Sequence, residues 1–284
     1  MTIATGSQGL RPSETVSAPL AARDPRDSRW LVAAAQILVL FLVVGLWEWA
    51  VAAGWIAAGK AGQPSRIFAL FIDSVASGEL SHHLYVTLYE EFLGFAIGVG
   101  GGTAVGWGLW WSRPLSRILE PFAVIFNGIP KIALAPPMIV WFGIFETSKV
   151  VLAATICFVV AWLSAYAGTR QVDHDLLDML KAMGASKWQR FVKIVIPASM
   201  PWVISAIKIN IGFALVGAVV GEFVASNRGL GYLAVQAAIQ FQMDRLWMIV
   251  FVIMLVAAAQ YWMVLWAERR LLAWTGEGSL RAVA

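Results

Sequence analysis

The chain is short of charge and has a single cysteine. Charged residues make up 13% of its 284 residues, whereas an ordinary soluble domain has about 25%. Hydrophobic residues make up 60%. This balance excludes a disordered chain and almost every class of soluble enzyme, and the lone Cys157 excludes an internal disulfide.

Signatures of catalysis are missing as well. The sequence has no Gly-x-x-x-x-Gly-Lys-(Ser/Thr) phosphate loop, no His-Glu-x-x-His zinc motif and no Gly-x-Ser-x-Gly nucleophile turn. His82 and His83 are adjacent, so on a helix they point in different directions and make a poor metal site. We therefore expect no catalytic residue, metal, cofactor or nucleic-acid partner, and any ATP hydrolysis has to come from another chain.

What the chain has instead is long apolar runs. There are six, each near the ~20 residues that cross a bilayer as a helix, and several end in tryptophan, which membrane interfaces favour. The first run is too long for the apolar region of a signal peptide. We therefore expect an all-α integral membrane protein with about six transmembrane helices. The runs cover residues 30–56, 92–111, 120–142, 149–166, 202–224 and 246–266.

Positive charge predicts the orientation of these spans. Six spans put both termini on one side of the membrane. If that side is the cytoplasm, the inner segments hold fourteen of the 21 Lys and Arg residues and the outer segments five, while Lys131 and Lys208 lie inside spans. Cytoplasmic loops carry the excess of Lys and Arg, so we expect both termini inside.

The same pattern divides the chain into parts. A helix pattern with one apolar face begins at Pro64, and we expect this helix to lie along the outer surface. The expected parts are a disordered cytoplasmic tail (1–29), the first transmembrane helix (30–56), an outer segment with the interfacial helix (57–84), a transmembrane domain (85–272) with a cytoplasmic loop (167–200), and a cytoplasmic tail (273–284).

The cytoplasmic loop 167–200 begins with the pattern of a short helix over residues 176–183. Gly184 follows and ends the helix, as a C-terminal glycine does. We expect this glycine to take a positive φ, which other residues adopt only at a cost.

A second short helix is expected over residues 186–194. Ser186 and Gln189 have the spacing of a capping box at its start, and Pro197 is expected to end it. Two amphipathic helices in a cytoplasmic loop can brace the bundle, lie on lipid headgroups or bind a partner protein, and physics alone weights these roles about equally.

This loop resembles the EAA loop of the permease subunits of bacterial ABC importers. That motif is Glu-Ala-Ala, three residues, Gly, nine residues and Ile-x-Leu-Pro; here nine residues separate Gly184 from Ile-Val-Ile-Pro at 194–197. Asp178 replaces the motif's glutamate, and Met179 and Leu180 replace its alanines. The residues that match the usual continuation after the glycine are Ala185, Ser186, Lys187 and Trp188.

The resemblance extends over residues 64–272 and is strongest to the nitrate, sulfonate and taurine branch. It implies a type I ABC importer fold in the bacterial cytoplasmic (inner) membrane. It also implies a second permease copy in a homodimer, two ATPase subunits, and a periplasmic or lipid-anchored substrate-binding protein. The implied cargo is a small polar solute, mainly an organic or inorganic anion. The matching segments are 130–136, 141–144, 148–150, 229–232 and 268–270.

By the same resemblance the loop contacts the ATPase. Polar contacts are implied for Asp178 and Lys187, and an apolar contact that tolerates sliding for Met179 or Met183. The residues assigned to this coupling loop are Asp178, Met179, Met183, Gly184, Ala185, Ser186, Lys187, Ile194 and Pro197.

A stripe of small residues marks the second span. Glycines repeat every four residues, so they share one helix face and let another helix approach closely. Packing within the chain is favoured over a dimer interface. The glycines of this stripe are Gly94, Gly98, Gly102 and Gly106.

Three polar residues inside spans are candidates for the translocation path. Lys131 and Asn127 lie in the proline-rich third span, whose broken backbone has to face protein or water. Lys131 either attracts an anion or plays a structural or snorkelling role. Glu222 is either part of an outer gate or structural, and Lys208 is expected to reach headgroups or a loop acid.

The alternative function is a stand-alone secondary transporter or channel. Such proteins need their own coupling-ion site and are often built from two repeated halves. The basic loop occurs only once, between the fourth and fifth spans, so the importer permease is favoured.

Overall fold

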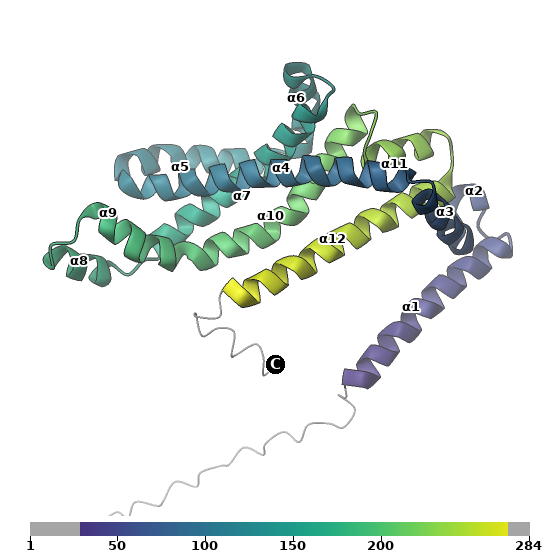
Figure 1. Cartoon of the computed structure of the whole chain (residues 1–284), viewed down its shortest axis with the longest axis horizontal. Helices are drawn as coiled ribbons and strands as arrows, with labels where there is room; N and C mark the ends of the chain where they lie inside the picture. The colour runs from purple at the N-terminus through teal and green to yellow at the C-terminus, as the bar shows by residue number, and fades with distance from the viewer. Residues whose placement is uncertain (1–28, 272–284) are drawn as a thin grey trace, which may run out of the picture. The chain divides into compact units, whose positions relative to one another are not determined.

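The computed structural model describes residues 29–271, and every regular element in this range is helical (Figure 1). The chain divides into two units, 1–47 and 48–284. The first described helix, α1 (Arg29–Ala52), has Gln36 as its only polar side chain between Trp30 and Trp47. A helix that is apolar on all sides suits a membrane span.

The remaining helices belong to the second unit. They are α2 (Ala58–Ala61), α3 (Pro64–Ala76), α4 (Glu79–Gly108), η2 (Leu109–Trp111), α5 (Arg113–Gly128), η3 (Lys131–Leu134), α6 (Ala135–Phe142), α7 (Glu146–Arg170), α8 (His174–Ala182), α9 (Lys187–Arg190), η4 (Phe191–Val195), α10 (Ile196–Val224), α11 (Leu230–Ile239) and α12 (Met243–Leu271).

Within residues 29–271, five helices are long and apolar enough to cross a membrane, or six if a bent pair of helices counts as one span. The pair joins α5 to η3 and α6 through a 92° bend, because Pro130 interrupts the helix there. The expected third span is therefore not one continuous helix, and α6 stands steeply to α5 in Figure 1. The expected first span is also shorter, since its helix ends at Ala52.

Helix α4 is much longer than its apolar run. It begins at Glu79, thirteen residues before the expected start at Phe92, so the outer segment of the sequence-based division ends inside this helix. Gly78, with φ of 77°, supplies the left-handed turn that precedes it. About three and a half helical turns that carry polar residues are thus part of the bundle.

The centre of the second unit is the contact of α4 with α7, with α10 against both. The glycine stripe of α4 makes the first contact possible. A Cβ on Gly106 would lie 2.7 Å from the carbonyl oxygen of Trp162, and one on Gly94 would lie 3.0 Å from that of Val150. The stripe faces α7 of the same chain, and the two backbones nearly touch.

The expected interfacial helix is α3, and its first turn is held from two sides. The Glu48 carboxylate accepts hydrogen bonds from Gln63 Nε2 at 2.6 Å and from the Ser65 N–H at 3.0 Å. The Asp244 carboxylate accepts from the Gln63 N–H at 2.7 Å. Two acids thus satisfy donors at a helix N-terminus, where the dipole favours negative charge.

The expectation that Pro197 ends the second loop helix is wrong. The helix continues from Lys187 to Val224 through the π segment η4, in which the Ile196 N–H donates to the Phe191 carbonyl. Pro197 then lies in the first turn of α10, where a proline without an N–H costs no α-helical hydrogen bond.

Candidate functional sites

The loop between α7 and α10 is a hairpin of α8 and α9, and a side chain caps the start of each helix. The Asp173 carboxylate caps α8 by accepting from the Asp175 N–H at 2.8 Å. The capping box of α9 is present, with Gln189 N donating to Ser186 Oγ at 3.2 Å and Ser186 N donating to Gln189 Oε1 at 2.8 Å. Between them Gly184 has a φ of 84°, which confirms the expected left-handed turn.

Helix α9 is tied to the inner end of α4. Lys187 Nζ donates to the carbonyl oxygen of Trp111 at 2.6 Å and lies 5.2 Å from the centre of the Trp111 ring. The rings of Trp188 and Phe191 lie 5.9 and 5.5 Å from that of Trp111. The resemblance implies a contact of Lys187 with the ATPase, but here its ammonium group binds within the chain. Because these contacts join α9 to η2, a displacement of α9 would also displace η2 and the end of α4.

One face of the hairpin, which carries two methionines, is exposed. Met179 and Met183 are 52% and 74% exposed, whereas Asp178, although exposed, lines the cavity behind the hairpin. Ile194, by contrast, packs onto a buried cluster that includes Leu177, so it braces the loop. The exposed methionines give the hairpin an adaptable apolar surface.

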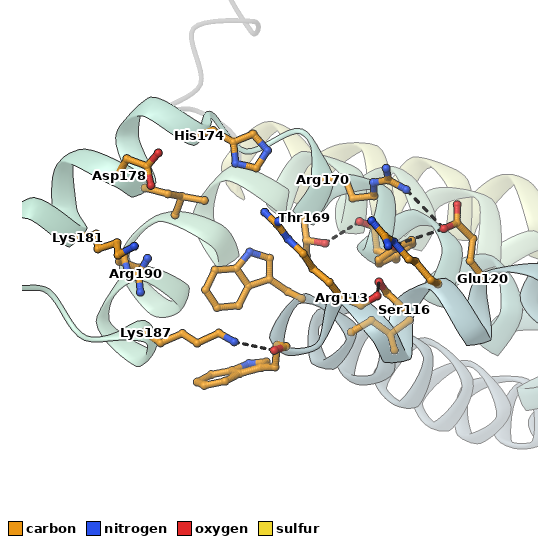
Figure 2. Close-up of a pocket in the computed structure, with 16 residues that line it drawn as sticks. Arg113, Ser116, Glu120, Thr169, Arg170, His174, Asp178, Lys181, Lys187 and Arg190 are labelled. Atoms are coloured by element: carbon orange, nitrogen blue, oxygen red, sulfur yellow. Dashed lines mark hydrogen bonds and ion pairs between the residues drawn. The ribbon is translucent and has the colours of Figure 1, made fainter.

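Behind the hairpin lies a hollow of about 650 Å³, here called the inner cavity (Figure 2). Side chains from η2, α5, α7, α8 and α9 line it. Basic side chains dominate its wall, with Glu120 and Asp178 as the acidic ones. The basic residues are Arg113, Arg117, Arg170, Lys181, Lys187 and Arg190. No sequence motif marks this cavity, because it assembles from five helical elements that lie apart in the chain.

Lys131 and Asn127 meet at the break between α5 and η3. Lys131 Nζ donates to the Asn127 carbonyl at 3.1 Å and to its Oδ1 at 3.3 Å. A cation that binds the last carbonyls of a helix complements its dipole. Lys131 thus has a structural role at the C-terminus of α5. The role of Lys131 and Asn127 in an anion path stays a prediction.

Glu222 is buried where α4, α10 and α11 meet. Its Oε1 accepts from Thr87 Oγ1 at 2.7 Å, and its Oε2 accepts from the Gly231 N–H at 2.6 Å. The Thr87 hydroxyl in turn accepts from the Leu230 N–H at 2.8 Å. Glu222 is 1% exposed, so its carboxylate serves as a node between three helices.

Beside this node lies an ion pair that the sequence analysis missed. Glu90 on α4 and Lys149 on α7 are both buried, with 3.5 Å between Glu90 Oε1 and Lys149 Nζ. In the sequence Lys149 is the first residue of the apolar run 149–166, and Glu90 precedes the run 92–111, so neither position predicts a buried charge. We call Thr87, Glu90, Lys149 and Glu222 the outer cluster. A buried charge that loses its partner is costly.

The interpretation of Lys208 needs correction too. Its Nζ lies 2.5 Å from Glu268 Oε1 on α12, so it pairs with a span residue and not with a headgroup or a loop acid. The pair fastens the last turns of α12 to the middle of α10.

The broken helix, the central stripe and the loop hairpin define a multi-pass membrane permease. The family model described as "Binding-protein-dependent transport system inner membrane component" matches residues 96–273, and the chain belongs to this family.

Three known proteins illustrate the similarity. The "Putative aliphatic sulfonates transport permease protein SsuC" of Bacillus subtilis is 28% identical over 84% of this chain and 86% of its own. A "Probable ABC transporter permease protein" of Haemophilus influenzae is 33% identical over 67% of this chain and 78% of its own. An inward-facing structure of the MetNI methionine ABC transporter has a TM-score of 0.58 at 20% identity, covering 67% of this chain and 93% of that one, and shares the fold.

Proposed function

We propose that the chain forms the transmembrane half of an ATP-driven importer in a bacterial cytoplasmic membrane. ATP hydrolysis takes place on two separate ATPase subunits, since the chain has no phosphate loop. A binding protein outside the cell delivers the solute, and a second copy of the chain completes the path. The family match and the named relatives support this proposal.

The cargo we propose is a small organic or inorganic anion of the sulfonate, taurine or nitrate type. The name of the Bacillus subtilis relative points to sulfonates. Lys131 and Asn127 at the helix break are the candidates to attract the anion. Glu222 is less suited to line the path, because both its carboxylate oxygens are already hydrogen-bonded inside the bundle.

The observation that carries the coupling role is the hairpin geometry. Met179 and Met183 face outward, while Lys187 and Trp188 fix α9 to the inner end of α4. A short helix carried on a glycine turn moves as a rigid body. A push on the methionine surface by an ATPase is thereby passed to α4, and through its glycine stripe to α7.

A pair of glycine variants tests this role. Gly184→Val should strain the turn and should lower ATP-driven uptake, or the amount of ATPase that co-purifies, because a Cβ at positive φ costs about 1–2 kcal/mol. Gly54→Val is the matched control: Gly54 has φ of 77°, and at neither glycine would a Cβ meet an atom within 4 Å. Normal ATPase recovery and uptake for Gly184→Val would contradict the coupling role.

A further inference from the structure

The inner cavity has more positive charge than the chain itself neutralises. Arg170 pairs with Glu120 at 3.5 Å, and Lys187 is bonded to the Trp111 carbonyl. Four basic side chains on its wall have no ion pair and no side-chain hydrogen bond within residues 29–271. These are Arg113, Arg117, Lys181 and Arg190.

Arg190 shows most clearly that the cations of the inner cavity lack acceptors. Its Nε atom is buried and has no hydrogen-bond partner among the described residues. This guanidinium lies beside other cations, and none of the described residues supplies an acceptor for its Nε–H. An oxyanion with several acceptor oxygens supplies one, because the planar guanidinium binds phosphate through two parallel hydrogen bonds.

The composition of α5 indicates where such an anion comes from. Arg113, Ser116 and Arg117 line the cavity from one face of the helix, while Leu115 and Ile118 are exposed on another. Exposed tryptophans stand beside the cavity on η2 and α9. Tryptophan favours the depth of the lipid headgroups, and basic pockets on the cytoplasmic side of membrane helices bind anionic headgroups.

We propose that the inner cavity binds a phosphate group, and that its source is the headgroup of an anionic phospholipid of the inner leaflet. The labelled Arg113 and Arg170 approach from the bundle side, and Lys181 and Arg190 from the loop hairpin (Figure 2). A bound phosphate therefore bridges the bundle and the hairpin. The lipid then stiffens the hairpin against α5 and α7.

Calorimetric titration of the full-length chain in neutral detergent tests the proposal. Short-chain phosphatidylglycerol should bind more tightly than short-chain phosphatidylcholine. Arg113→Gln with Arg190→Gln should weaken phosphatidylglycerol binding about 25-fold, at roughly fivefold for each cation lost near the membrane surface. Arg113→Lys with Arg190→Lys keeps both charges but loses the paired hydrogen bonds of the guanidinium, so it should recover only part of the affinity, and that recovery separates charge from misfolding.

Lys193→Gln is the matched control, since Lys193 is exposed on η4 and does not line the cavity. It should leave phosphatidylglycerol binding unchanged. Binding of inorganic phosphate without phosphatidylglycerol would keep the phosphate site but overturn the lipid source. Equal affinity for both lipids, or equal loss in the Lys193 and the Arg113 and Arg190 variants, would overturn the proposal. None of these measurements depends on an ATPase.

Discussion

At the outer end of the bundle, charged side chains are buried and contact partners within the chain, whereas at the inner end basic side chains are open and in excess. Lys149 faces Glu90 in the outer cluster, and both oxygens of Glu222 accept hydrogen bonds. The inner cavity has six basic residues against two acidic ones. The outer end is thus built to hold helices together on its own, while the inner end is built to receive something from outside the chain.

Cysteine labelling gives the largest contrast between the two ends. With buried Cys157 replaced by Ala, a cysteine at Asn227 should react with a membrane-impermeant thiol reagent added outside intact cells, and one at Ser186 should not. The excess of Lys and Arg on the hairpin side is the physical reason. Reversed labelling would exchange the two ends and contradict the expected orientation.

The next largest effect is expected in the outer cluster. Lys149→Met should lower the free energy of unfolding by about 3–5 kcal/mol, because it leaves Glu90 buried without its cation. Thermal unfolding of the purified chain measures this. Lys60→Met, at an exposed outer lysine, should change little. Adding Glu90→Gln to Lys149→Met should restore stability, and failure to do so would mean that the ion pair is not the cause.

Helix α4 links the two ends, and its glycines offer an internal control. Gly102→Ala should cost about 1–3 kcal/mol in the free energy of unfolding, because a Cβ there would collide with the backbone of α7. Gly100→Ala should be neutral or slightly stabilising, since no atom lies within 4 Å of its would-be Cβ. Equal effects would show that α4 and α7 do not pack as described.

The smallest effect on stability is expected at the helix break. Lys131→Ala should cost only about 0.3–1 kcal/mol, the usual value of a cation at a helix C-terminus. Uptake of an anionic solute, measured at matched protein level, should nevertheless fall, and Lys131→Arg should retain it. Unchanged uptake in Lys131→Ala would assign this lysine to structure alone.

Local features of the fold follow from the sequence, because short-range chemistry determines them. The apolar runs predict five or six spans, and the positive φ of Gly184 and the capping box of Ser186 and Gln189 appear as expected. The role of Pro197 does not follow from the sequence, because a proline either ends a helix or lies in its first turn. The π segment before Pro197 decides between these roles, and it depends on the fold.

Features that join distant segments could not be predicted in this way. Glu90 and Lys149 are 59 positions apart, and each lies at the flank of an apolar run, where a charge normally faces water. The polar turns at the start of α4 gave no sign that they continue into the bundle. The inner cavity likewise needs α5, α7 and both loop helices in place before its charges meet.

The π segment η4 sets the phase between the hairpin and α10. Its hydrogen bonds run from residue i to i+5, so it holds one residue more than an α turn over the same stretch. If all five residues formed a regular α-helix, the extra residue would rotate α9 by about 100° relative to α10. Lys187 and Trp188 would then turn away from Trp111. The direction in which the hairpin faces is therefore encoded in the π geometry of this segment, and a change that makes it a regular α-helix would turn the hairpin without altering any of its contact residues.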